Sequence, residues 1–455
     1  MVIQGHLKKI TTWGLLASLV VIFLGWSANI PEEDLAQYAH THALRKYTYP
    51  IIYSQVDLLT SVFGNNNIAF RFPAFFFVLV TLYTLYRFAL LVVNREVALL
   101  TILIFATLQA TFLNNITASP EISLTAFYTA AIGQLSAYYK ERRLVNLTEG
   151  IAAAFFAAIS TSTFPEIAGS YDPFHMIADL GWGFFPWGLF LVLGMIDKVK
   201  ELRKGQVPFI KQIGFYAFLV TLVILSINPY PSRFDVIILC PMGALITAEY
   251  IYKIFYTVNE RRAKTLFKVQ IILSFVFIGL LFALVWFPFP EANYYGMIHF
   301  FALLSAFTWL IFFSSISNKL VIACTVLSIG TNLVLNTYFF PNLLTYQAGS
   351  ELGKLASQSA GADLKLYSYR TEPSASLAFY AGVPVISDST FKHLVSQKNC
   401  FVYTTQDMLD EFKAARPDLQ VFASRPDFPI HAVNIDFFDP AKRRKMTSSK
   451  ILIKL

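Results

Sequence analysis

Two carboxylate-bearing segments stand out as places where this sequence could carry out acid–base chemistry. The first is PEEDLAQYAH, in which Asp34 is the last of three consecutive acidic residues. The second is ITASPEIS, in which Glu121 follows Pro120 at the start of an apolar stretch. A carboxylate in the first turn of a helix can simply cap it and offset the helix dipole. Two carboxylates that meet in one polar cavity could instead supply a general base.

One cation lies at the start of an apolar run, in the segment NPYPSRFDVIILCP (228–241). Arg233 could hold a phosphate there, because a guanidinium matches phosphate geometry. It could equally snorkel to lipid headgroups or pair with Asp235. His40 and His42 follow Asp34 closely, but an i, i+2 pair diverges on a helix. We therefore predict no metal site and expect no cofactor, while a role for a divalent metal stays open.

The elements that would position these residues are membrane helices. Of the 455 residues, 56% are hydrophobic and 14% are charged, and the mean hydropathy is +0.54. A soluble chain averages about 25% charged residues, and a membrane span needs roughly 20 apolar ones. The first apolar run has a basic start and no clear cleavage site, so we expect it to remain as a helix. The eleven predicted spans are 10–30, 70–93, 97–114, 122–139, 147–163, 182–198, 211–229, 234–256, 267–288, 297–316 and 320–341.

The net charge of +8 comes from basic residues that cluster in the short connections between apolar runs. Such a charge would suggest a nucleic-acid partner in a soluble protein, but here the positive-inside rule explains it. With a cytoplasmic N-terminus, every predicted cytoplasmic connection is basic. The opposite connections are acidic or nearly neutral, apart from Arg233 and the Arg45–Lys46 pair. An odd number of spans then places the C-terminus outside, and no nucleic-acid partner is expected.

The composition changes after Asn342, where the long apolar runs stop. We predict a transmembrane domain at 1–345, with surface helices in the loop 31–69, and a soluble domain at 346–455. In the latter, predicted helices at 350–359, 374–381, 388–396 and 407–415 alternate with the strands LKLYSY, VPVIS, NCFVYTT, VFAS, VNIDFF and KILIKL. The basic run 442–445 is expected to be a solvated loop. The three cysteines are expected to be small buried residues without a disulfide.

A collinear series of short matches resembles the GT-C glycosyltransferases of the aminoarabinose transferase and protein O-mannosyltransferase type. DLAQYA, beginning at Asp34, is similar to the D-E-x-x-Y-A that opens the family's first outside loop, with Leu in place of Glu. RFP, beginning at Arg71, matches its R-x-P at the second helix. Further matches are Glu121 in the place of an Asp, FFPWGLFL (184–191), PSRFDVIILCP (231–241) and SLAFYAGVPV (376–385).

The resemblance implies an inverting transfer of a sugar from a polyprenyl-phosphate carrier to an acceptor at the outer membrane face. The acceptor is lipid A in one branch of the family and a protein hydroxyl in the other. Asp34 would be the catalytic base and Glu121 would support it. Arg233, Arg71 and Tyr38 would contact the substrate or its phosphate. The resemblance further implies a bacterial inner-membrane protein surrounded by membrane lipid, with its C-terminal domain in the periplasm.

Several departures from the family pattern leave a second interpretation open. The lysine of the family's E-K-P-P motif, thought to contact the carrier phosphate, is replaced by YTYPIIYSQVDLL. An arginine of the second outside loop is also missing. Eleven helices are predicted instead of thirteen, with the missing pair between Lys140 and Trp182. The chain could therefore be a catalytically inactive relative that acts as a membrane scaffold or partner subunit. A transporter is disfavoured, because the sequence shows no internal repeats.

Overall fold

The structure is a computed structural model that places most of the chain. The predicted phosphate ligand Arg233, the Arg45–Lys46 pair and part of the connection before Trp182 lie outside the described ranges. Those ranges are 2–43, 50–160, 175–205, 207–228, 235–258, 260–313, 316–359, 365–388, 390–397, 400–417, 419–430 and 433–455.

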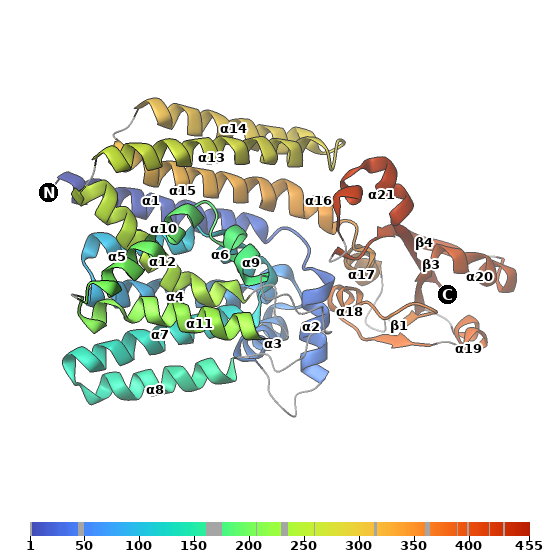
Figure 1. Ribbon diagram of the computed structural model, residues 1–455. Coiled ribbons are helices and arrows are strands. Elements are labelled where there is room, and N and C mark those ends of the chain that lie inside the picture. The colour runs from blue at the N-terminus through green and yellow to red at the C-terminus, as the bar shows by residue number, and fades with distance from the viewer. Residues whose placement is uncertain are drawn as a thin grey trace.

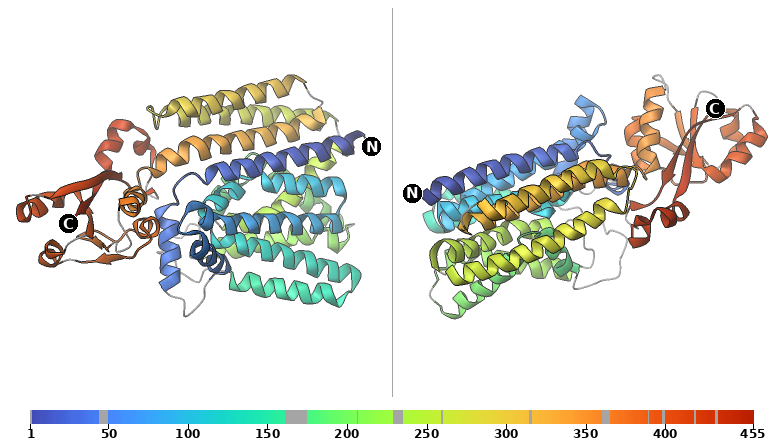
Figure 2. Two further views of the ribbon diagram at one scale, coloured as in Figure 1. Left: turned by 180° about the vertical axis from the view of Figure 1, so that it is seen from behind. Right: turned by 90° about the horizontal axis from the view of Figure 1, so that it is seen from above.

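Long helices that run roughly side by side form the body of the molecule (Figures 1 and 2). Six of them are long and apolar enough to cross a membrane. Their lengths follow from uninterrupted apolar sequence, because a helix satisfies its own backbone hydrogen bonds in lipid. The six are α1 (Val2–Gly25), α4 (Asn67–Val92), α12 (Val236–Tyr252), α13 (Glu260–Trp286), α14 (Asn293–Phe313) and α15 (Ile316–Val334).

Two bent pairs raise the number of candidate spans to eight in the described part of the chain. They are α5 (Arg95–Ala106) with α6 (Gln109–Thr117), bent by 50°, and α9 (His175–Gly183) with α10 (Gly188–Arg203), bent by 117°. The helices α8 (Leu144–Ile159) and α11 (Ile213–Ile227) are apolar but shorter than each of the six spans. The polar residues of α7 (Pro120–Glu141) lower its hydropathy. Each of the eleven predicted runs is therefore mainly helical in its described residues, and six to eight of them satisfy the length and composition test.

The loop between α1 and α4 contains two shorter helices, α2 (Glu32–Ala43) and α3 (Ile51–Phe63). Figure 1 shows α2 crossing the end of the bundle at a steep angle to α1. We call this end the docking end, because the C-terminal part of the chain rests on it. The opposite end, where α4 and α7 terminate, is called the basic end.

The C-terminal unit (Ala348–Leu455) is a five-stranded sheet with helices around it. The strand order is β2-β1-β3-β5-β4; the first three strands are parallel, and β5 is antiparallel to both β3 and β4. The four helices that sequence patterns predicted are present as α17 (Ala348–Ser359), α18 (Ala375–Ala381), α19 (Phe391–Ser396) and α20 (Leu409–Ala415). The strands are β1 (Lys365–Ser368), β2 (Val385–Ser387), β3 (Cys400–Thr405), β4 (Gln420–Asp427) and β5 (Ser448–Lys454).

Two expectations for this unit were wrong. VNIDFF is not a strand: Ile435–Phe438 forms a 3-10 turn, because the Asn434 side chain caps it by accepting from the Phe437 amide. The basic run is not a loop either, but lies in α21 (Pro440–Met446). Within it Arg443 is buried, and its guanidinium lies about 5 Å from the ring centres of Phe289 and Tyr346.

The apolar core joins the C-terminal unit to the bundle. Phe379 and Tyr380 of α18 belong to the cluster that fills the bundle around α4, α5 and α12. Phe428 and Phe437 pack with the cluster of α13, α14 and α15. All three cysteines are buried and unbridged, as expected. The unit is thus held on the docking end by aromatic side chains, and it can contribute residues to a site there.

Candidate active site

Asp34 lies in the first turn of α2, at the docking end, with 7% of its surface exposed. Its helix begins where three acidic residues meet the positive end of the helix dipole. Tyr38 follows one turn later and donates a 2.5 Å hydrogen bond to Oδ1 of Asp57 in α3. The Tyr38 ring also meets Tyr53 and Phe70 edge-on. Tyr38 therefore fixes α2 against α3 and α4, which gives it a positioning contact that its predicted substrate role did not include.

Glu121 is the second predicted carboxylate, and it is also buried at the start of a helix. It follows Pro120 at the first position of α7 and is 6% exposed. The preceding Ala118 adopts a left-handed conformation with φ of 52°, which turns the chain sharply from α6 into α7. The Ser119 hydroxyl donates to the Asn114 side chain and holds that turn. A carboxylate in this first turn is stabilised in its charged form by the helix dipole.

Arg71 is fully buried in the first turns of α4 and donates hydrogen bonds to backbone carbonyls. The distances are 2.6 Å to Ile116, 3.3 Å to Gly25, 3.1 Å to Trp26, 2.8 Å to Ala28 and 2.8 Å to Asn29. These carbonyls belong to the end of α1, the segment leading to α2 and the end of α6, where the helical hydrogen bonds run out. The Asn67 side chain also donates to the carbonyls of Trp26 and Ala28. Asp34 is close enough to act electrostatically on the guanidinium. Arg71 therefore joins the chain segments that carry both carboxylates, and contact with a phosphate would require some of these bonds to be given up.

Arg233 stays a prediction, because it lies outside the described residues. The described helix nearest to it in sequence is α12, whose N-cap residue Asp235 is 7% exposed. The structure therefore brings Asp34, Glu121 and Arg71 to one end of the bundle and leaves the place of Arg233 undetermined.

The C-terminal unit supplies a residue to this end that sequence reasoning did not single out. The Tyr380 hydroxyl accepts from the Ile30 amide at 2.8 Å and donates to Oδ1 of Asn67 at 2.6 Å. Burial raises the pKa of Tyr380 to about 12, so its hydroxyl remains a donor. The only signal in the sequence was that Tyr380 falls in the SLAFYAGVPV segment. It braces the chain immediately before α2, and thereby the position of Asp34.

The three neighbouring acids of α2 have different environments. The Glu32 carboxylate accepts from the backbone amides of Ala375 and Ser376, at 2.6 and 3.1 Å, and from the Ser374 hydroxyl at 3.0 Å. Glu32 thus caps α18 and docks the C-terminal unit on α2. Glu33 lines a cavity, and Asp34 is buried beside the bundle.

That cavity, of about 470 Å³, lies between α2 and the C-terminal unit. Its charged lining is mostly acidic, with Glu32, Glu33, Glu372 and Asp427 alongside a single cation, Lys450. Burial raises the pKa of the Asp427 carboxyl, although the Ala348 amide and Lys450 oppose this shift. No group of His, Cys, Asp and Glu residues suited to hold a metal occurs among the described residues.

Comparisons with known proteins identify the architecture. Residues 50–167 match the family model described as dolichyl-phosphate-mannose-protein mannosyltransferase. The crystal structure of ArnT from Cupriavidus metallidurans bound to undecaprenyl phosphate superposes with a TM-score of 0.68 over 99% of this chain and 98% of that chain, at 10% identity. The chain has the GT-C glycosyltransferase fold.

The GT-C fold is of the aminoarabinose transferase and protein mannosyltransferase type, which confirms the predicted fold class. The apo structure of the same ArnT gives a TM-score of 0.65, again at 10% identity, and covers 100% of this chain and 98% of that one. No curated protein sequence matches the chain significantly. The shared fold includes the C-terminal unit, since the match extends over nearly the whole of both chains. The chain is therefore an integral membrane protein with the GT-C architecture.

Proposed function

We propose that this protein transfers a sugar from a polyprenyl-phosphate carrier to a hydroxyl group of a lipid or protein acceptor. The observation that carries the proposal is the fold, shared over nearly the full length with an ArnT whose crystal structure holds undecaprenyl phosphate. Two buried carboxylates at the end of the bundle that meets the C-terminal unit supply the acid–base groups that such a transfer needs.

In the proposed reaction Asp34 removes the proton of the acceptor hydroxyl. The acceptor oxygen then forms a bond to the anomeric carbon, and the bond from that carbon to the phosphate oxygen breaks. The phosphate leaves with the bonding electrons on the polyprenyl carrier, and the sugar is inverted at the anomeric carbon. Glu121 orients the acceptor or shares the proton that Asp34 removes from the acceptor hydroxyl. Arg233 is the proposed cation for the leaving phosphate, because the Arg71 donors face carbonyls.

The proposed setting is the inner membrane of a bacterium, with the docking end facing the periplasm. Charge supports this orientation: α7 ends in Lys140, Arg142 and Arg143 at the basic end, whereas α2 begins with three acids at the docking end. Donor and acceptor would then meet on the side where the C-terminal unit covers α2.

An inactive relative that serves as a scaffold or partner subunit is the alternative. It is favoured by the full engagement of Arg71 with carbonyls and by the missing lysine in the first loop. Loss of two charged contacts to a leaving phosphate would cost roughly 1.5–3 kcal/mol each. A scaffold needs no such contacts, so catalysis has to be measured directly.

The test uses the full chain in proteoliposomes, with a labelled polyprenyl-phosphate sugar and a lipid or protein acceptor fraction. We expect wild-type protein to consume the donor, and Asp34→Asn to lower transfer by roughly 10²–10⁴-fold. Asp410→Asn, an exposed aspartate of α20, is the matched control and should leave transfer unchanged. Transfer by Asp34→Asn at the wild-type rate would rule out Asp34 as the catalytic base. Absence of wild-type turnover, with stable co-purification of another protein, would favour the scaffold.

A further inference from the structure

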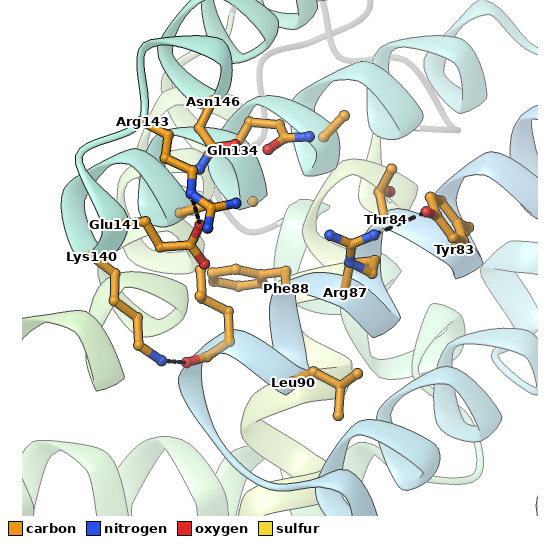
Figure 3. Close-up of a pocket in the computed structure, with 14 residues that line it drawn as sticks. Tyr83, Thr84, Arg87, Phe88, Leu90, Gln134, Lys140, Glu141, Arg143 and Asn146 are labelled. Atoms are coloured by element: carbon orange, nitrogen blue, oxygen red, sulfur yellow. Dashed lines mark hydrogen bonds and ion pairs between the residues drawn. The ribbon is translucent and has the colours of Figure 1, made fainter.

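A second cavity, of about 420 Å³, lies at the basic end of the bundle, between α4 and α7 (Figure 3). Its lining combines the cations Arg87, Lys140 and Arg143 with one carboxylate, Glu141, and the polar side chains of Gln134 and Asn146. None of these residues belongs to the proposed transfer site, which occupies the other end of the same helices. The proposed transfer site therefore does not account for this cavity.

The charge of this cavity is only partly neutralised by the protein. Arg143 pairs with Glu141, Nε to Oε2, at 3.5 Å. The Arg87 guanidinium instead donates to the Tyr83 hydroxyl at 3.1 Å, and Lys140 donates to the Leu91 carbonyl at 3.0 Å. In the described part of the chain neither Arg87 nor Lys140 has a carboxylate partner. Two cations that line one cavity and do not pair with its carboxylate, Glu141, are suited to hold an anion.

The shape of the cavity favours the anionic headgroup of a lipid over a small soluble anion. The lining residues on α4 run from Leu91 near the helix end to Tyr83, a depth of about 12 Å at 1.5 Å per residue. Along α7 the lining includes the small residues Ala130, Gly133 and Ala137, which leave a groove against α4. A phosphate alone would fill only the charged mouth of this groove.

Exposed apolar side chains along the edge of the groove are suited to contact the apolar part of a lipid. Tyr83 and Leu90 both line the cavity and are 61% and 38% exposed on the outer surface of the bundle. That surface faces hydrocarbon in a membrane, so the groove is open to lipid from the side. Cations close to the helix end, with the exposed side chains of Tyr83 and Leu90 beside them, match a glycerophospholipid, whose phosphate sits at the interface above its acyl chains.

We propose that this groove is a binding site for an anionic glycerophospholipid, with the lipid phosphate between Arg87 and Lys140. Arg143 lies at the rim, where Glu141 already offsets its charge. The neighbouring Arg142 packs over the rings of Tyr138 and Tyr139 and takes no part. The site is independent of the transferase proposal, because its residues lie at the opposite end of α4 and α7. Under the proposed orientation it would select lipid from the cytoplasmic leaflet, where anionic lipids gather.

The test is native mass spectrometry of the full chain in a neutral detergent, titrated with phosphatidylglycerol or with phosphatidylcholine. We expect tighter retention of phosphatidylglycerol, and a loss of about tenfold or more in its binding for the double variant Arg87→Gln/Lys140→Gln. The matched control is Arg203→Gln/Lys204→Gln, which removes one arginine and one lysine exposed at the end of α10. Equal losses in the two double variants would overturn the proposal, because binding would then reflect diffuse charge.

A third variant tests the groove without changing any charge. The position of a methyl group at Gly133 lies 3.5 Å from Cβ of Phe88, so a small side chain fits there while a leucine would enter the groove. We expect Gly133→Leu to lower phosphatidylglycerol binding while elution and melting temperature stay those of wild type. If Gly133→Leu does not fold, the comparison of Arg87→Gln/Lys140→Gln with its control tests the proposed lipid site. Displacement of phosphatidylglycerol by excess inorganic phosphate, or equal binding of the two lipids, would contradict a lipid site.

Discussion

Two arginines of one helix show how differently the two ends of this bundle are built. Arg71 and Arg87 both belong to α4 and lie about 24 Å apart along it. Arg71 is fully buried and donates to five backbone carbonyls, from α1, the segment before α2 and α6. Arg87 is exposed at the edge of a cavity, and its guanidinium donates to the Tyr83 hydroxyl at 3.1 Å.

The difference follows from the backbone around each arginine. At the docking end α1 and α6 both stop, and their last carbonyls lie inside the protein, where an unmatched acceptor is costly. Arg71 donates to these carbonyls, together with the Asn67 side chain, so its guanidinium stabilises the fold. At the basic end α4 and α7 end near the surface, where water or lipid can satisfy the backbone. Arg87 thus remains able to bind a ligand. An arginine thus stabilises the fold at the docking end, whereas an arginine of the same helix can bind a ligand at the basic end.

Substitution of the two arginines gives the largest expected contrast. We predict that Arg71→Met lowers the free energy of unfolding by about 3–5 kcal/mol, because the buried carbonyls of Ile116 and Asn29 lose the donor that Arg71 provides. Arg87→Met should change it by less than about 0.5 kcal/mol, since its surroundings are exposed. Thermal unfolding of the purified chains would measure both. Similar melting temperatures for the two variants would show that the contrast is mistaken.

Removal of the Glu32 carboxylate tests how firmly the C-terminal unit is held at the docking end. Glu32→Ala leaves two amides at the start of α18 without their acceptor, and we predict a loss of about 2 kcal/mol in local stability. Hydrogen exchange of α18 would report this loss. Glu32→Gln keeps one acceptor oxygen and should restore part of the protection. Unchanged exchange in both variants would argue against the cap.

A smaller effect is expected when the brace before α2 is weakened. Tyr380→Phe removes one hydroxyl that accepts from Ile30 and donates to Asn67, at a cost of about 1 kcal/mol. Because Asp34 follows closely in the chain, transfer should fall more than stability does. A comparison of transfer rate with melting temperature separates the two. Loss of stability with an unchanged rate would mean that Tyr380 does not position α2.

The smallest predicted effect depends on pH. Burial raises the pKa of Asp427, so the folded state binds its proton more tightly than the unfolded state does. This contribution to stability is fully present below the unfolded pKa and is lost as the pH rises through the folded pKa. Asp427→Asn should therefore flatten the pH dependence above pH 4 by under about 1 kcal/mol. Melting temperatures at several pH values would test it, and an unchanged slope would contradict it.

Sequence patterns predicted the positions of the two carboxylates well, for physical reasons that are local. The acidic first turn after α1 and the Pro120–Glu121 pair are helix-start signals that depend only on neighbouring residues. The apolar runs likewise predicted every long helix, although three of them fall short of a full span by length or composition.

The contacts that distinguish the arginines could not be predicted, because they are distant in sequence. Arg71 meets a carbonyl at Ile116, 45 residues away, and Tyr380 meets Ile30 across 350 residues. A match to a family motif suggested that Arg71 contacts the substrate or its phosphate, which stays a prediction, but it did not indicate the carbonyls to which Arg71 donates. Residues 433–438 were expected to form a strand because they are largely apolar. They contain a 3-10 turn instead, because the Asn434 side chain caps that turn.

The most direct measurement is a cryo-electron microscopy structure of the full chain in nanodiscs that contain phosphatidylglycerol and a polyprenyl phosphate. The contrast between the two ends predicts two separate lipids. The polyprenyl phosphate should place its phosphate at the docking end, near Asp34 and Glu121, while phosphatidylglycerol should lie with its phosphate between Arg87 and Lys140. Polyprenyl phosphate held at the basic end, with no lipid phosphate near Asp34, would contradict both assignments.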